Sequence, residues 1–125
     1  MGYAWLLVAA GGALGAVLRY GAGLAAAQWF DASWPISTAF VNVVGSFVLG
    51  FVAGLGPLVS PEVRTFVGTG LLGAFTTFST YSVETVVLAN SGDAIGAIGN
   101  VAFNTIIGVL GASLGLALAR FVSQA

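Results

Sequence analysis

The sequence predicts an all-α membrane protein with four transmembrane helices in each subunit. Hydrophobic residues make up 58% of the 125 positions and charged residues only 6%, whereas soluble domains carry roughly 25% charged residues. A chain with so few charges could not cover a folded surface in water, so lipid is its expected solvent. The apolar runs are long and unbroken rather than alternating with polar residues, which favours helices over a membrane barrel.

Four apolar stretches account for most of the chain, and each is long enough to cross a hydrocarbon core of roughly 30 Å. We expect helices over about residues 3–28, 36–55, 63–89 and 95–122, within a single transmembrane domain over residues 1–125. Polar and turn-forming segments separate them at residues 31–35, 56–62 and 90–93. In the second of these segments, Ser60 is the expected N-cap of the third helix and Pro61 its first residue.

Several function classes are excluded by what the chain lacks. It contains no cysteine and no histidine, so thiol nucleophiles, zinc sites and imidazole acid–base catalysis are absent. Three arginines and a net charge of −1 provide no footprint for nucleic acid. No nucleophile–base pair or metal cluster is recognisable, which makes an enzyme the least favoured class.

The few charges also bear on orientation in the cell membrane. Four spans place both chain ends on one side together with Arg64 and Arg120, and Arg19 toward the other side. By the positive-inside rule this weakly favours cytoplasmic termini. The bias is small enough to permit insertion in both orientations, and hence antiparallel dimers.

Glycine is frequent, and many of the nineteen glycines stand four residues apart. This spacing puts small residues on one helix face, where two backbones can approach closely. It predicts tight helix packing but says nothing about what the protein transports. The pairs are Gly11 and Gly15, Gly50 and Gly54, Gly92 and Gly96, and Gly111 and Gly115.

The most polar part of the chain lies in the middle of the third stretch. Residues 76–82 carry six hydroxyl groups in seven positions, interleaved with aromatic side chains. Such a run has low helix propensity, and a helix broken at mid-membrane would expose backbone groups able to bind ions. A continuous helix whose hydroxyls bond to preceding carbonyls is the alternative. The residues alone leave both open.

Two other stretches present uncharged polar side chains. Asn42 and Ser46 share one face of the second stretch, and Asn100 and Asn104 form a stripe on the fourth. Interhelical hydrogen bonding is the simpler interpretation of both. Arg19 suits a vestibule that concentrates anions, or a membrane boundary where its side chain reaches the headgroups.

Hydroxyls, amides and aromatic ring edges can all face a small anion. Conduction requires binding that is strong enough to admit an ion and weak enough to release it, and uncharged donors meet that requirement. Four tightly packed helices leave little room for a large substrate. The residues therefore favour a narrow pore for a small ion.

Three motifs follow one another along the chain, namely GALGAVLRY at residues 12–20, NVVGSF at 42–47 and GAFTTFSTYSVE at 73–84. In these motifs and their order, the chain resembles the fluoride-channel family known as Fluc or CrcB. The resemblance covers nearly the whole chain.

The resemblance implies an antiparallel, dual-topology dimer that passively exports fluoride from the cytoplasm through two narrow pores. It implies a structural sodium ion (Na+) at the dimer centre, held by backbone carbonyls of Gly73 and Thr76 from each subunit. Arg19 matches the vestibule arginine of the family. The implied fluoride-pore residues are Asn42, Ser46, Phe78, Ser79, Thr80, Tyr81 and Asn104.

Two positions depart from the family pattern. Tyr81 stands where the second pore aromatic is usually Phe, and the fourth helix carries Asn100 and then Asn104 where the family usually has Tyr or Asn and then Ser. Some relatives pair non-identical subunits, so a homodimer and a heterodimer with a related chain both remain open.

Two other function classes compete with a channel. A proton-coupled exporter of cationic drugs needs a membrane-embedded carboxylate; the first stretch has none, and Glu84 lies late in the third. A non-transporting assembly subunit would need only the glycine faces.

Overall fold

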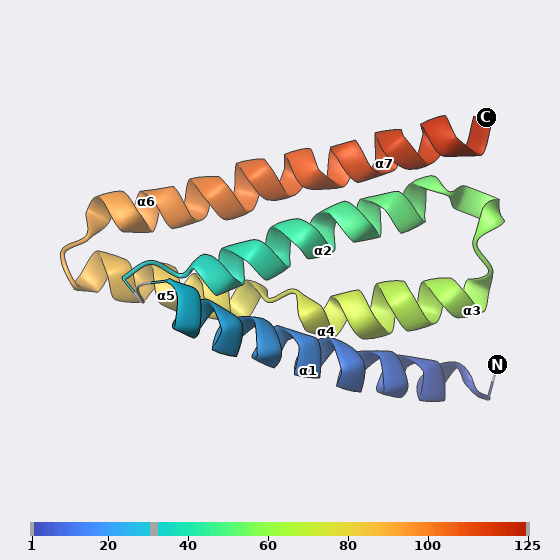
Figure 1. The fold of residues 1–125 in the computed structure, drawn as a ribbon, viewed down its shortest axis with the longest axis horizontal. Helices are drawn as coiled ribbons and strands as arrows, with labels where there is room; N and C mark the ends of the chain where they lie inside the picture. The colour runs from blue at the N-terminus through green and yellow to red at the C-terminus, as the bar shows by residue number, and fades with distance from the viewer. Residues whose placement is uncertain (1, 31–32, 125) are drawn as a thin grey trace.

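The chain forms four long, roughly antiparallel helical rods, as Figure 1 shows. The computed structural model describes residues 2–30 and 33–124, so residues 31 and 32, at the predicted first break, lie outside the described part. Within the described residues all regular structure is helical, and both chain ends lie at the same end of the bundle. The predicted all-α, four-helix architecture is confirmed.

The first two rods are single helices, α1 (Ala4–Trp29) and α2 (Ile36–Gly54). A short 3-10 turn, η1 (Gly56–Leu58), follows α2. The third and fourth rods are composite. The third comprises α3 (Pro61–Val63), a π-helical stretch η2 (Arg64–Leu72), α4 (Gly73–Phe75) and α5 (Phe78–Asn90), and the fourth comprises α6 (Ala94–Ala102), a π-helical stretch η3 (Phe103–Ile107) and α7 (Gly108–Gln124).

All four rods are long and apolar enough to cross a membrane. At the start of the third rod, Ser60 is the N-cap, as the sequence predicts, with its hydroxyl accepting from the Val63 amide at 3.3 Å. Asp93 caps α6 in the same way through the Gly96 amide at 2.8 Å. These two caps fix where the third and fourth rods begin.

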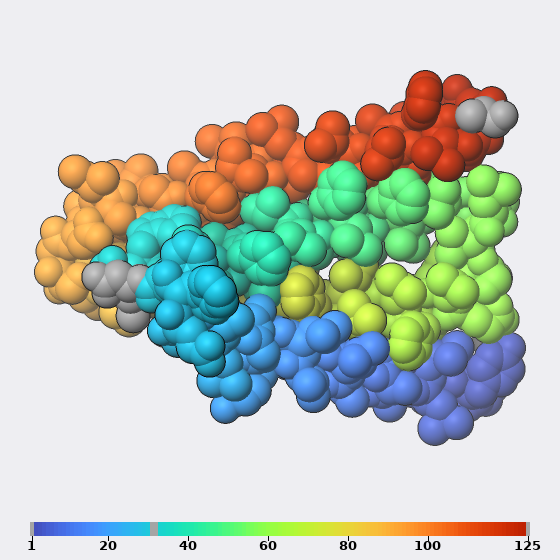
Figure 2. All heavy atoms as spheres, viewed as in Figure 1, coloured from blue at the N-terminus to red at the C-terminus, as the bar shows by residue number. Residues whose placement is uncertain are grey.

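The third rod changes neighbours along its length. Its first half, η2 and α4, packs against α1, whereas α5 packs against α6. The long partners α2 and α7 run side by side, and α2 lies between α7 and the third rod (Figures 1 and 2). The change of partner falls where α4 ends and α5 begins.

Glycines form the closest rod crossings. A Cβ on Gly15 would overlap the Leu71 carbonyl, and a Cβ on Gly50 would overlap that of Ala112. These contacts confirm the packing prediction for most of the glycine pairs. For Gly92 and Gly96 the prediction is wrong: Gly92 is a turn residue with φ +89°, and Gly96 receives the Asp93 cap.

The buried interior is small and contains both apolar and polar residues, whereas many large apolar side chains face outward. Trp5 and Ile95 are among the most exposed residues, as expected for a surface covered by lipid. Small apolar residues and hydrogen-bonded polar groups fill the centre instead. The buried residues include Ala39, Val41, Leu72, Ala97, Ala119, Thr38, Thr77 and Asn100.

Candidate functional site

The third rod is broken between α4 and α5. Thr76 (φ −81°, ψ 159°) and Thr77 (φ −152°, ψ 112°) both have extended backbones. The Thr77 hydroxyl then caps α5 by accepting from the Thr80 amide at 3.2 Å. Of the two interpretations left open by the sequence, the broken helix is therefore the right one.

A side chain from α2 satisfies the backbone at the break. Asn42 Oδ1 accepts from the Thr77 amide at 2.8 Å, and Asn42 Nδ2 donates to the Thr77 carbonyl at 3.2 Å. Thr77 is only 7% exposed, and a buried backbone group without a partner would cost about 1–3 kcal/mol. Asn42 thus stabilises an extended segment that could not persist alone in an apolar surrounding.

The break also releases two carbonyl groups. In a continuous α-helix the amides of Thr77 and Thr80 would donate to the carbonyls of Gly73 and Thr76. Here those amides donate to Asn42 Oδ1 and to the Thr77 hydroxyl. The Gly73 and Thr76 carbonyls lose those helical partners, and carbonyl oxygens are the ligand type that suits a hard cation such as sodium.

One polar hollow lies beside the break, and we call it the Asn42 hollow. Its volume is about 260 Å³. The rings of Phe78 and Tyr81 lie on one side of it, with centroids 5.4 Å apart and planes tilted by 58°. The hollow is lined by Asn42, Gly45, Ser46, Leu49, Thr76, Thr77, Phe78, Tyr81 and Asn104.

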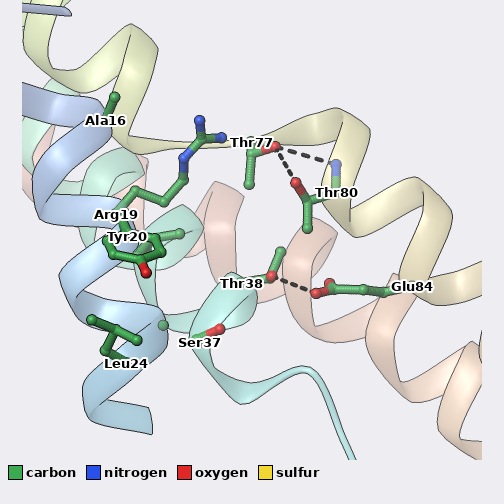
Figure 3. A pocket seen from close by; sticks show the side chains of 11 residues that line it. Ala16, Arg19, Tyr20, Leu24, Ser37, Thr38, Thr77, Thr80 and Glu84 are labelled. Atoms are coloured by element: carbon green, nitrogen blue, oxygen red, sulfur yellow. Dashed lines mark hydrogen bonds between the residues drawn. The ribbon is translucent and has the colours of Figure 1, made fainter. Parts of the chain in front are cut away.

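A second hollow, the Arg19 hollow, has a volume of about 390 Å³. In Figure 3 the Arg19 side chain extends from α1 toward Thr77. Thr38 donates to Glu84 Oε1 at 2.8 Å, and Glu84 Oε2 is buried without a partner among the described residues. The lining residues are Ala16, Arg19, Tyr20, Gly23, Leu24, Ser37, Thr38, Val41, Thr77, Thr80 and Glu84.

Thr77 lines both hollows and is the centre of a hydroxyl cluster. Its Oγ1 donates to Thr80 Oγ1 at 2.9 Å and lies 3.3 Å from Ser79 Oγ. The two hollows therefore share Thr77, with the Thr80 and Ser79 hydroxyls in contact with its own. A small anion that leaves the Arg19 hollow could exchange water for hydroxyl donors beside the break.

The structure gathers most of the expected pore residues, but not all in one place. Five of them line the Asn42 hollow, namely Asn42, Ser46, Phe78, Tyr81 and Asn104. Thr80 lies in the Arg19 hollow instead, and Ser79 joins the cluster only through its hydroxyl contact. The reason is geometric, since successive helix positions point about 100° apart and cannot share one face.

Sequence reasoning missed Thr38 as a site residue. It is buried, lines the Arg19 hollow and bonds Glu84. The signal was present, because Thr38, Asn42 and Ser46 are spaced four apart on α2. The polar stripe on that helix is one turn longer than the predicted pair.

Comparison with known proteins agrees with this architecture. The family described as CrcB-like protein, Camphor Resistance (CrcB), matches residues 6–116. The fluoride-specific ion channel FluC of Shewanella sp. (strain W3-18-1) is 50% identical over 101 residues, which cover 79% of this chain and 82% of that relative.

Two further relatives with that same name cover more of the chain. The one from Shewanella sediminis (strain HAW-EB3) is 46% identical over 112 residues, 88% of this chain and 90% of the relative. The one from Shewanella halifaxensis (strain HAW-EB4) is 42% identical over 120 residues, with 93% and 97% covered. The resemblance inferred from three motifs is confirmed. With its four spans, this multi-pass protein of the cell membrane belongs to the CrcB-like family.

Proposed function

We propose that this chain is the subunit of a fluoride-selective channel that passively releases fluoride from the cytoplasm. The observation that carries the proposal is the break in the third rod, where hydroxyls and aromatic rings gather beside Asn42. The relatives named as fluoride-specific ion channels support the choice of ion. The activity is transport rather than catalysis.

The proposed path joins the two hollows. Arg19 raises the local anion concentration in the vestibule, and the hydroxyls of Thr80 and Ser79 take over from water near the break. The ion then passes the ring edges of Phe78 and Tyr81, which carry partial positive charge. No acidic side chain is among the residues lining the Asn42 hollow, so an anion meets no fixed repulsion there.

The pores form in an antiparallel dimer. Phe78 is 79% exposed in the single subunit, which is unsuitable for a ring that must strip water from an ion. A second subunit, either identical or a related chain, covers this side and closes the path, and membrane lipid surrounds the rest. The weak charge asymmetry of the chain is compatible with either orientation.

The proposal includes a sodium ion at the centre of the dimer, where it would link the two broken rods. The carbonyls of Gly73 and Thr76 from each subunit are the proposed ligands, because the break removes their helical partners. When bound, the ion would supply positive charge to carbonyl oxygens that the break leaves without these helical partners. Its role is structural.

Fluoride efflux from proteoliposomes, recorded with a fluoride electrode, tests the proposal. Phe78→Ile should reduce fluoride flux below detection, because an aliphatic side chain has no positive edge for the ion. Phe121→Ile is the matched control, since Phe121 is similarly exposed but lies far along α7, outside the Asn42 hollow. Absent flux from folded wild-type protein, or chloride flux equal to fluoride flux, would refute the function, and normal flux in Phe78→Ile would refute the pore role.

A further inference from the structure

A polarised chain of hydrogen bonds leaves the break and returns to the same rod one turn later. Three amide side chains form it, and we call Asn42, Asn104 and Asn100 together with Thr85 the amide relay. The successive donors and acceptors are Thr77 N to Asn42 Oδ1 (2.8 Å), Asn42 Nδ2 to Asn104 Oδ1 (2.8 Å), Asn104 Nδ2 to Asn100 Oδ1 (2.9 Å), Asn100 Nδ2 to Thr85 Oγ1 (2.9 Å) and Thr85 Oγ1 to the Tyr81 carbonyl (2.8 Å).

The direction of the relay is set at its first bond. A backbone amide can only donate, so the Thr77 amide requires an oxygen, and Asn42 must present Oδ1. The nitrogen of Asn42 then faces Asn104, which must present its own oxygen. The nitrogen of Asn104 in turn faces Asn100, which must therefore also present its oxygen. A chain of aligned bonds of this kind strengthens each member.

The relay occupies the amide hydrogens that would otherwise face an ion. Asn42 Nδ2 donates its two hydrogens to the Thr77 carbonyl (3.2 Å) and to Asn104 Oδ1. Asn104 Nδ2 donates its two hydrogens to the backbone carbonyl (3.0 Å) and the side-chain oxygen of Asn100. Although Asn42 and Asn104 line the Asn42 hollow, they have no hydrogen left to donate to an anion there.

The two ends of the relay enclose the aromatic pair. It starts on Thr77, one residue before Phe78, and finishes on the carbonyl of Tyr81. The first turn of α5 is therefore tied at both ends to α2 and to the fourth rod. This fixes how that turn is rotated, and with it the direction of both rings.

We propose that the amide relay positions the Phe78–Tyr81 pair, and that its three asparagines act through those rings rather than as ligands of the ion. The proposal rests on the proposed function for its transport consequence. Among the side chains lining the Asn42 hollow, the groups left to face the ion are the Ser46 and Tyr81 hydroxyls and the edges of the two rings.

Substitutions at relay residues that do not line the hollows can distinguish a positioning role from direct binding of the ion. Asn100 is 0% exposed, and neither Asn100 nor Thr85 lines either hollow. Thr85→Val keeps the side-chain shape but removes both relay bonds of its hydroxyl, whereas Thr85→Ser keeps them. Ser113→Ala is the control, because the Ser113 hydroxyl bonds only the Val109 carbonyl of its own helix among the described residues.

Proteoliposome flux gives the first measurement. We expect Thr85→Val to lower fluoride flux on the order of tenfold, because a small misplacement of a group that contacts the ion can reduce a rate by that factor or more. The ratio of fluoride flux to chloride flux should also fall. Thr85→Ser and Ser113→Ala should stay within about twofold of wild type. Asn100→Leu should repeat the loss. Wild-type flux and selectivity in both Thr85→Val and Asn100→Leu would overturn the proposal, as would an equal loss in Ser113→Ala.

Hydrogen exchange at the Thr77 backbone amide gives a second measurement that needs no transport. The relay predicts faster exchange of this amide in Asn100→Leu and Thr85→Val, and unchanged exchange in Thr85→Ser. Unchanged protection in all variants would overturn the relay itself. If wild-type protein passed no fluoride while the exchange pattern appeared, the proposed function would fail and the relay would stand.

Discussion

Gly15→Ala should push α1 away from the third rod. An added Cβ would overlap the Leu71 carbonyl oxygen and lie 2.9 Å from the carbonyl carbon and 3.1 Å from Cα of the same residue. All three atoms belong to backbone, which cannot rotate aside as a flexible side chain can. The two rods must therefore shift apart, and overpacking of this kind costs about 1–3 kcal/mol.

The same substitution at Gly21 provides the comparison. Gly21 lies on the same helix with nothing within 4 Å of an added Cβ. Ala is favoured over Gly inside a helix by about 1 kcal/mol, and both variants receive this gain. The difference between Gly15→Ala and Gly21→Ala therefore isolates the overpacking, at about 1–3 kcal/mol.

Reversible unfolding in mixed micelles, titrated with SDS and followed by tryptophan fluorescence, measures both free energies of unfolding. We expect Gly21→Ala to be at least as stable as wild type and Gly15→Ala to unfold at a lower SDS fraction. Equal shifts in the two variants would show that α1 and η2 do not cross at Gly15 as closely as the structure has them.

Two further substitutions test the Arg19 hollow. Arg19→Gln should lower fluoride flux several-fold in dilute buffer, and the loss should fade toward 1 M salt, where charges are screened within about 3 Å. Arg120→Gln, which lies outside that hollow, should change the flux little. A loss in Arg19→Gln that does not depend on salt would contradict a steering role. Thr38→Val removes the hydroxyl that donates to Glu84 and should destabilise the fold by about 1–3 kcal/mol, whereas Thr38→Ser should not. The same micelle titration in a Glu84→Gln background should show a smaller loss, because the side chain that Thr38 bonds is then uncharged. An undiminished loss would place the effect elsewhere.

Much of the fold follows from local properties of the sequence. The scarcity of charge predicts lipid as the solvent, and the apolar stretches between turn-forming segments predict four spans, because helix formation in lipid depends mainly on continuous apolar length. The cap at Ser60 is equally local, since it involves residues three apart. Spacing by four residues also predicts the glycine crossings at Gly15 and Gly50.

The break at Thr76 and Thr77 was not decided by the sequence, because hydroxyl-rich segments can also bond to their own helix, as Thr76 does with the Leu72 carbonyl at 3.0 Å. What decides it is Asn42, thirty-five residues earlier in the chain, which satisfies the exposed backbone. A contact at that separation exists only once α2 lies beside the third rod.

The division of the polar residues between two hollows is likewise a property of the assembled bundle. The residues themselves indicate a narrow pore for a small ion, but not that Thr80 faces Arg19 while Phe78 and Tyr81 face Asn42. Sequence alone determined the solvent, the number of spans and the kind of groups available to an ion. Only the tertiary structure decided which of these groups meet, because hydrogen bonds between rods depend on how the rods are rotated against one another.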